Sequence, residues 1–168
     1  MTALRRLLAG PASALIVPVP EAEPLLAGAP VAALGPHITV LYPFRRSREL
    51  DDATLERLAA LATATDAFDY ELAELGRFPG VLYVAPRPAE PFAALVARCA
   101  AQWPEHPPYG GAFAETVPHL TLAEGDEPAG LAERATARLP LAARADQLWL
   151  MTRQRGGWRR RAALPLGR

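Results

Sequence analysis

The sequence predicts an α+β fold of two similar lobes, each a mostly antiparallel sheet with outer helices, separated by a central cleft. Two segments nearly repeat each other about half a chain apart: Pro36–Val40 reads PHITV and Pro118–Leu122 reads PHLTL. Each is followed by a segment with helical spacing of its apolar residues and by a pair of segments typical of a hairpin. The second half of the chain therefore repeats the order of elements in the first: motif strand, helix and hairpin. We expect both halves to form a single domain over residues 1–168.

The N-terminal part is expected to supply two strands. Ala14–Val19 is a short apolar run interrupted and followed by prolines, which is typical of a buried strand. Glu21–Leu34 is rich in Pro, Gly and Ala, and a short helix around Glu23–Ala27 is one interpretation. The first motif strand is predicted over His37–Tyr42, and Pro43 closes it.

The middle of the chain predicts two helices and a hairpin between them. Asp51 is a good N-cap for an amphipathic helix over 52–64. A strand around 68–72 and a returning strand over 81–85 flank a turn at Phe78-Pro79-Gly80. The second helix begins near Pro91 and has an apolar stripe of five residues. These are Phe92, Leu95, Val96, Cys99 and Trp103.

The C-terminal part predicts the second motif strand, a short helix and a second hairpin. The motif strand covers about Val117–Ala123. Asp126 is expected to cap a helix that runs to about Leu139. The hairpin strands, 146–152 and 158–164, flank Gly156-Gly157.

The composition excludes several classes of function. All 18 basic residues are arginine and equal the 18 acidic residues in number, so no global charge attracts nucleic acid or a membrane. Without lysine the chain has neither a Schiff-base nucleophile nor a P-loop. The single cysteine, Cys99, excludes an internal disulfide and a cysteine zinc cluster, and its place in the helical stripe indicates a packed thiol.

No apolar run is long enough to span a membrane, so we expect a protein with no membrane partner. The start, Arg5-Arg6 followed by 7–19, loosely resembles a signal peptide. Prolines interrupt it and the strand at Ala14–Val19 uses part of it, so we expect a soluble, cytoplasmic protein.

The two motifs predict a paired site. Strand alternation places His37 and Thr39 on one face, and His119 and Thr121 likewise. Histidine exchanges protons near neutral pH, so one ring can take a proton from water while the other protonates a leaving oxygen. Threonine hydroxyls can hold phosphate oxygens. This set suits cleavage of a phosphate ester, and a 2′,3′-cyclic phosphate in particular; the alternative is two buried strand histidines with satisfied hydrogen bonds.

Other chemistries fit less well. A metal site would have only His37 and His119, because neither motif contains an acid and alternation points Glu124 to the opposite face. A serine hydrolase would need a Gly-x-Ser-x-Gly elbow, which the sequence lacks. We therefore expect neither metal nor cofactor.

Around the motifs, several residues have two interpretations. Tyr42 is expected in the core with Ile38 and Val40 rather than as a base-stacking platform, and Phe78 and Tyr83 are expected to pack. The loop over 104–111, which carries His106 and Tyr109, is a lid or a connector. The first arginine group forms a solvated cluster or meets RNA phosphates; it consists of Arg45, Arg46 and Arg48. The second group gathers around the last hairpin as a positively charged rim or simply as part of a strand face; it consists of Arg153, Arg155, Arg159, Arg160 and Arg161.

The two motifs resemble the paired His-x-Thr-x signatures of the two-histidine phosphoesterases, and the resemblance extends over about Ala14–Leu166. That superfamily includes 2′-5′ RNA ligase-like proteins, RNA cyclic phosphodiesterases and tRNA-splicing cyclic phosphodiesterases. The resemblance implies a pseudo-twofold, bilobal α+β fold with a metal-independent site between the lobes. It also implies that His37 and His119 are the acid/base pair and that Thr39 and Thr121 anchor the phosphate. We favour His119 as base and His37 as acid.

We therefore expect a monomeric phosphodiesterase that acts on a nucleotide or an RNA end with a cyclic phosphate or a 2′-5′ linkage. A non-catalytic protein that binds a nucleotide or RNA end in the same cleft is the alternative. The balanced charge favours a small ligand or a short end over a long RNA.

Overall fold

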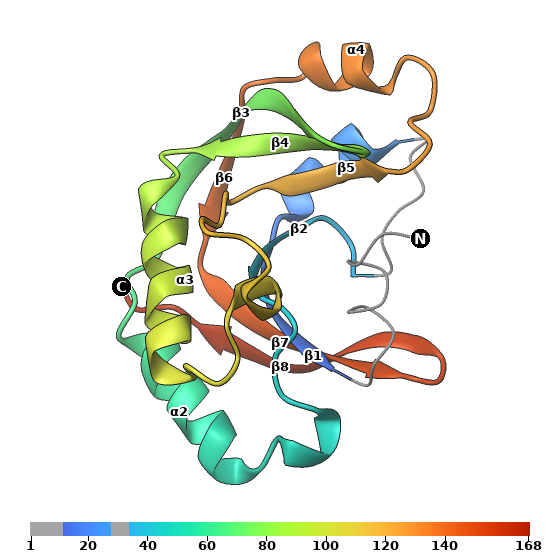
Figure 1. The fold of residues 1–168 in the computed structure, drawn as a ribbon. Coiled ribbons are helices and arrows are strands. Elements are labelled where there is room, and N and C mark those ends of the chain that lie inside the picture. The colour runs from blue at the N-terminus through green and yellow to red at the C-terminus, as the bar shows by residue number, and fades with distance from the viewer. Residues whose placement is uncertain (1–11, 28–33) are drawn as a thin grey trace.

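A computed structural model describes residues 12–27 and 34–168, which form one curled, antiparallel sheet of eight strands (Figure 1). The strand order is β6-β3-β4-β5-β2-β1-β7-β8. The strands are β1 (Ser13–Pro18), β2 (His37–Leu41), β3 (Phe68–Phe78), β4 (Val81–Arg87), β5 (Leu120–Glu124), β6 (Leu141–Ala145), β7 (Gln147–Gln154) and β8 (Gly157–Pro165). The α-helices are α2 (Asp52–Thr63), α3 (Glu90–Gln102) and α4 (Leu131–Thr136). The 3₁₀ turns are η1 (Pro20–Leu26), η2 (Ser47–Glu49) and η3 (Pro108–Gly111).

The predicted α+β class is confirmed, but the two halves of the sheet are not the two halves of the chain. The motif strand β2 lies with β1, β7 and β8, while β5 lies with β4, β3 and β6. The hairpin that follows each motif strand in the sequence therefore lies in the half of the sheet that holds the other motif strand. This exchange brings β2 and β5 together at the centre of the sheet, where the chain order alone does not place them.

The helices α2 and α3 cover one face of the sheet and enclose the main core (Figure 1). The predicted apolar stripe of α3 is buried in this core together with Ile38 and Leu120 from the two motif strands. Burial raises the pKa of the Cys99 thiol to about 12, as expected of a packed, unreactive thiol. The opposite face of β2 and β5 is left for polar groups.

The predicted elements are found in the structure, with differences at the second motif and near the C-terminal helix. The strand predicted from about Val117 begins only at Leu120, so His119 directly precedes β5. Asp51 caps α2 by accepting the backbone N–H of Thr54 at 2.8 Å, as predicted. Asp126 does not cap α4, which begins only after Gly130 at a left-handed φ of 72°. The strand β6 was not predicted, because its sequence, LAARA, lacks the β-branched and aromatic residues that favour strands.

Two expectations concern residues outside the described part of the chain. The signal-like start covers residues 1–11, and the ambiguous stretch before the first motif includes 28–33. Of that stretch, the structure describes η1, a 3₁₀ turn that begins earlier than the helix considered at 23–27. Among the described residues, no helix is long and apolar enough to cross a membrane.

Candidate active site

The two motifs meet at one pair of residues in the centre of the sheet. Ile38 of β2 pairs antiparallel with Leu120 of β5, and both side chains are buried in the main core. One residue further in each direction, side chains lie opposite one another on the other face. By this antiparallel register His37 faces Thr121, and Thr39 faces His119, which directly precedes the start of β5 at Leu120. The structure thus brings together all four residues singled out in the sequence.

Both imidazoles are held in the same way. The Nδ1 atom of His37 lies 2.7 Å from the carbonyl oxygen of Gly35, and that of His119 lies 2.7 Å from the carbonyl oxygen of Val117. A carbonyl can only accept, so each Nδ1 carries the hydrogen and donates it. In the neutral ring Nε2 is then the free proton acceptor, and it is also the atom that gives up a proton from the charged ring.

The surroundings lower the pKa of both histidines from the ordinary value of 6.5. Burial, which disfavours the charged ring, is the main cause at His37 and at His119. The backbone hydrogen bonds partly oppose this, since they favour the charged form. The charge of His119 lowers the pKa of His37 further. Two rings that interact in this way take up one proton more readily than two, which suits a division into acid and base.

The first motif strand has an irregularity directly after its threonine. Thr39 pairs with Ile16, but Leu41 pairs with the next residue, Leu15, so β2 has one extra residue at Val40. Val40 and Leu41 are consequently both buried in the main core. The strand alternation used in the sequence analysis fails at this point.

Tyr42 therefore lies on the face of the sheet that carries His37 and Thr39, the histidine face. It is buried as predicted, but with Ala14, Ile16 and Met151 in a second cluster rather than with the main core. The prediction that Tyr42 joins Ile38 was wrong because the bulge reverses the side on which it points.

The second motif strand has the matching irregularity. Thr121 pairs with Tyr83 and Ala123 with the adjacent Leu82, so β5 has its extra residue at Leu122. Leu122 and Ala123 are both buried. The pair Ala123–Leu82 faces the main core, so the next pair along the strands, Glu124 with Val81, faces the other way. Glu124 therefore lies on the histidine face. The prediction that Glu124 points to the opposite face was wrong for the same reason as at Tyr42.

An aromatic pair supports His119. The rings of Phe78 and Tyr83 are stacked with centroids 4.2 Å apart, and they contact the imidazole edge-on at 5.2 Å and 5.4 Å. The Tyr83 ring lies directly over Gly76, where an added Cβ would come within 2.3 Å of its Cζ. Phe78 and Tyr83 do pack, as predicted, but against a site residue, a contact that depends on the pairing of β4 with β5.

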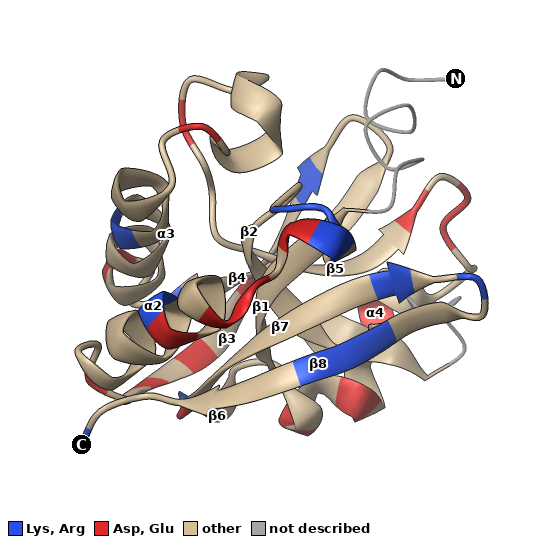
Figure 2. Cartoon of the chain, turned by 90° about the horizontal axis from the view of Figure 1, so that it is seen from below, with Lys and Arg blue, Asp and Glu red and all other residues tan. Residues whose placement is uncertain are grey.

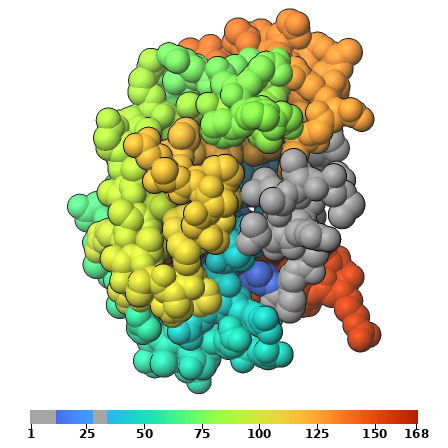
Figure 3. Space-filling model, in the orientation of Figure 1, coloured from blue at the N-terminus to red at the C-terminus, as the bar shows by residue number. Residues whose placement is uncertain are grey.

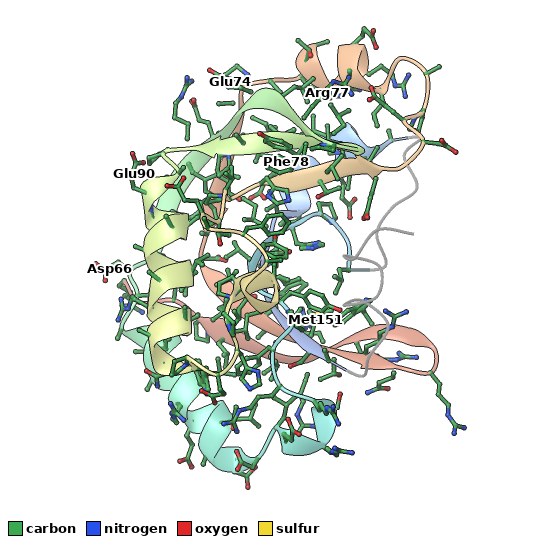
Figure 4. The ribbon with its side chains drawn as sticks, in the orientation of Figure 1. Asp66, Glu74, Arg77, Phe78, Glu90 and Met151 are labelled. Carbon is green, nitrogen blue, oxygen red and sulfur yellow. The ribbon has the colours of Figure 1, made fainter. Side chains whose placement is uncertain are left out.

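The half of the sheet beside His37 is built differently. Trp149 of β7 pairs with Ile16, the neighbour of Thr39, and the Arg160 guanidinium lies over the Trp149 ring at 4.5 Å. Trp149 also lines a pocket of about 420 Å³ with Gly35, the residue that accepts the His37 hydrogen bond. Figure 4 shows Phe78 and Met151 in the two different halves of the molecule. The backbone is thus nearly symmetric while the side chains are not.

The segment before the second motif contacts the end of the first. The Tyr109 N–H donates to the Tyr42 carbonyl at 2.6 Å, and Tyr109 has a left-handed φ of 53°, which is rare for a bulky residue. The yellow-to-amber atoms of this part of the chain occupy the middle of the face in Figure 3. The third histidine, His106, packs against Phe44 at 5.6 Å, apart from the paired motifs.

The first arginine group is partly engaged elsewhere. Arg45 donates to the Thr54 hydroxyl at 3.0 Å and pairs with Glu105 at 3.3 Å. Arg46 and Arg48 are exposed. Among the described residues, no group of three or more His, Cys, Asp or Glu side chains is arranged to hold a metal ion.

An α+β fold with two His-x-Thr pairs matched across the centre of an antiparallel sheet is that of a two-histidine phosphoesterase. The family model described as the 2′-5′ RNA ligase superfamily matches residues 11–157, and the chain belongs to this superfamily. No curated protein matches the sequence.

Solved structures show the same fold at low sequence identity. The protein TT0787 of Thermus thermophilus is 22% identical with a TM-score of 0.68, covering 92% of this chain and 97% of its own. E. coli LigT complexed with 3′-AMP is 17% identical with a TM-score of 0.63, covering 94% and 99%. LigT complexed with NADP+ is also 17% identical, with a TM-score of 0.62 and coverage of 94% and 98%.

Proposed function

We propose that the protein is a metal-independent phosphoesterase that cleaves a 2′,3′-cyclic phosphate or a 2′-5′ phosphodiester by paired-histidine acid/base catalysis. The observation that carries this proposal is the matched pair of tautomers. Each Nδ1 is committed to a backbone carbonyl, so both rings exchange protons through Nε2. The antiparallel register at Ile38 and Leu120 also sets each ring across from the threonine of the other motif.

The reaction requires one neutral and one protonated ring. In hydrolysis of a cyclic phosphate, His119 Nε2 takes a proton from water as the water oxygen forms its bond to phosphorus. The bond from phosphorus to one ribose oxygen breaks, and His37 Nε2 gives that oxygen its proton. Thr39 and Thr121 donate hydrogen bonds to the non-bridging oxygens, where negative charge develops. In the reverse of this step, the ribose hydroxyl attacks phosphorus and water leaves, and the two histidines exchange roles.

A nucleotide-type substrate fits the relatives of known structure. The E. coli LigT structures are complexes with 3′-AMP, NADP+ and ATP. In this chain, Trp149 gives an aromatic wall to a pocket that is also lined by Gly35, the hydrogen-bond partner of His37. A nucleoside next to the reacting phosphate is therefore the proposed ligand.

The test is hydrolysis of the four nucleoside 2′,3′-cyclic monophosphates in the presence of EDTA. We expect wild-type turnover that resists EDTA, and a fall of about a hundredfold or more in His37→Asn and His119→Asn. His106→Asn is the matched control and should retain turnover, because His106 lies apart from the motifs. The product isomer identifies which ribose oxygen leaves.

Two outcomes would contradict the proposal. A loss in His106→Asn as large as in the motif variants would indicate a general structural role of histidine. Tight binding of the cyclic nucleotides with complete recovery of unchanged ligand would instead identify a non-catalytic binding protein. The 2′-5′-linked dinucleotides need to be assayed alongside before turnover is judged absent.

A further inference from the structure

The hairpin of β7 and β8 concentrates the positive charge of the chain. Between Gln147 and Pro165 there is no acidic residue, although the whole chain has a formal net charge of zero. The hairpin contains Arg153, Arg155, Arg159, Arg160 and Arg161. All five are exposed, and Figure 2 shows the basic stretch along β8. Arg155, Arg159, Arg160 and Arg161 take part in none of the salt bridges found among the described residues.

Strand pairing separates these arginines onto two faces. Arg160 on β8 pairs with Met151 on β7, which belongs to the cluster on the histidine face. Arg153 lies two residues after Met151 on β7, on the same face, and pairs with Trp158 on β8. Arg159 pairs with Thr152, whose side chain is buried on the other face with Leu150. Arg153 and Arg160 therefore share the face of the candidate active site, and Arg159 does not.

This arginine face is continuous with the motif strand. A row of paired residues leads from Thr39 on β2 through Ile16 on β1 to Trp149 on β7. Adjacent strands lie about 4.8 Å apart, so the Trp149 backbone is about 10 Å from that of Thr39. Arg160 covers the Trp149 ring at 4.5 Å, and Trp158 contacts Tyr42 edge-on at 6.0 Å.

We propose that Arg153, Arg160, Trp149 and Trp158 bind the single-stranded RNA chain that leads to the reacting phosphate. Single strands are held by basic side chains that follow the phosphates and by flat groups on which bases stack. Arginine and tryptophan on one face provide both. The location of the reacting phosphate rests on the proposed function.

The test compares 2′,3′-cyclic AMP with a hexaribonucleotide that ends in a 2′,3′-cyclic phosphate. We expect wild-type kcat/KM to be higher for the hexamer and to fall more steeply with salt, with a log–log slope of about −0.7 for each phosphate contacted. Arg160→Gln should lower the ratio of the two kcat/KM values about tenfold. Arg159→Gln removes the same charge from the adjacent residue on the other face, and should leave the ratio within twofold.

Failure of this inference is distinguishable from failure of the proposed function. If cyclic AMP is hydrolysed but Arg160→Gln and Arg159→Gln give the same ratio, the RNA surface is overturned and the enzyme remains. If neither substrate turns over, binding of a hexamer with a 3′-phosphate, followed by fluorescence anisotropy, tests the surface alone. A Kd raised about tenfold only by Arg160→Gln supports it. Equal effects, or displacement of the RNA by polyglutamate at the same charge concentration, overturn it.

Discussion

Ile38 and Leu120 pair across the middle of the sheet order, with four strands on either side. A local pseudo-two-fold axis passes between them, because each histidine lies opposite the threonine of the other motif. Both motif strands also bulge at the residue after the threonine, against adjacent positions of their outer neighbours β1 and β4. The backbone therefore presents two equivalent half-sites, and the differing side chains around them are what can assign the histidines different roles.

The first prediction concerns the threonines. Thr39→Val and Thr121→Val keep the β-branched shape that a strand favours and remove only the hydroxyl donor. If each hydroxyl stabilises the developing charge, each variant should lose roughly 2–4 kcal/mol of transition-state stabilisation, measured as kcat/KM on a cyclic nucleotide. Thr63→Val, at the exposed end of α2, is the control. Turnover within twofold of wild type in both motif variants would contradict the role.

The second prediction concerns the support of His119. Gly76→Ala places a methyl group where the Tyr83 ring now lies, with its Cζ only 2.3 Å from the new Cβ. The ring must move, and the imidazole that it contacts moves with it. We expect kcat to fall by between tenfold and a hundredfold, because small displacements of a catalytic group cost that much. The free energy of unfolding should fall by about 1–3 kcal/mol, as in other overpacked sites.

A double-mutant cycle separates the two effects of Gly76→Ala. In a Tyr83→Ala background the three atoms nearest to the new methyl group are gone, so adding Gly76→Ala should lower kcat little further. Gly156→Ala, in the β7–β8 turn with nothing within 4 Å, is the matched control. Additive losses in the cycle would show that Gly76 acts independently of the Tyr83 ring.

The spacing of residues close together in the sequence predicted the helices and strands. The pairing of strands far apart in the sequence determined which side chains surround the two histidines. The stripe of α3 and a strand at each motif follow from spacing within a few residues. The structure confirms the stripe and the first motif strand, whereas the second strand begins only after His119. The faces of Tyr42 and Glu124 could not be predicted, because a bulge is a property of two paired strands and alternation assumes a regular one. The contact of Phe78 and Tyr83 with His119 likewise depends on β4 pairing with β5, although the sequence places the hairpin nearer the first motif.

The third prediction concerns the pH dependence of activity. The profile of kcat/KM reports the free enzyme, in which burial lowers the pKa of both histidines below 6.5. A base that must be neutral and an acid that must be protonated then give a bell with its maximum below pH 6.5. A bound anionic phosphate favours the charged rings, so the kcat profile should shift to higher pH. A kcat/KM profile that is flat from pH 5 to 9 would contradict the paired assignment.

The fourth prediction concerns stability. Since burial lowers the pKa of His37 and His119 in the folded state, the unfolded chain binds more protons than the folded chain below the ordinary value of 6.5. The free energy of unfolding should therefore hold above pH 6.5, decline as the pH falls from 6.5 to the lowered pKa values, and level off below them, where both states are protonated. The double variant His37→Gln/His119→Gln lacks these two groups, so its decline over the same window should be shallower.

Urea unfolding at a series of pH values from 7.5 downward measures this difference. The carboxylates that are ion-paired in the fold titrate in both proteins, so they cancel when the two stability curves are subtracted. His106→Gln removes the third histidine and should leave the wild-type decline in place if the decline comes from the motif pair. A subtracted curve that is constant across the window would show that the motif histidines bind protons equally in the folded and unfolded chain. The acidic kcat/KM optimum would then lose its physical cause, because both effects follow from the same burial of the two rings.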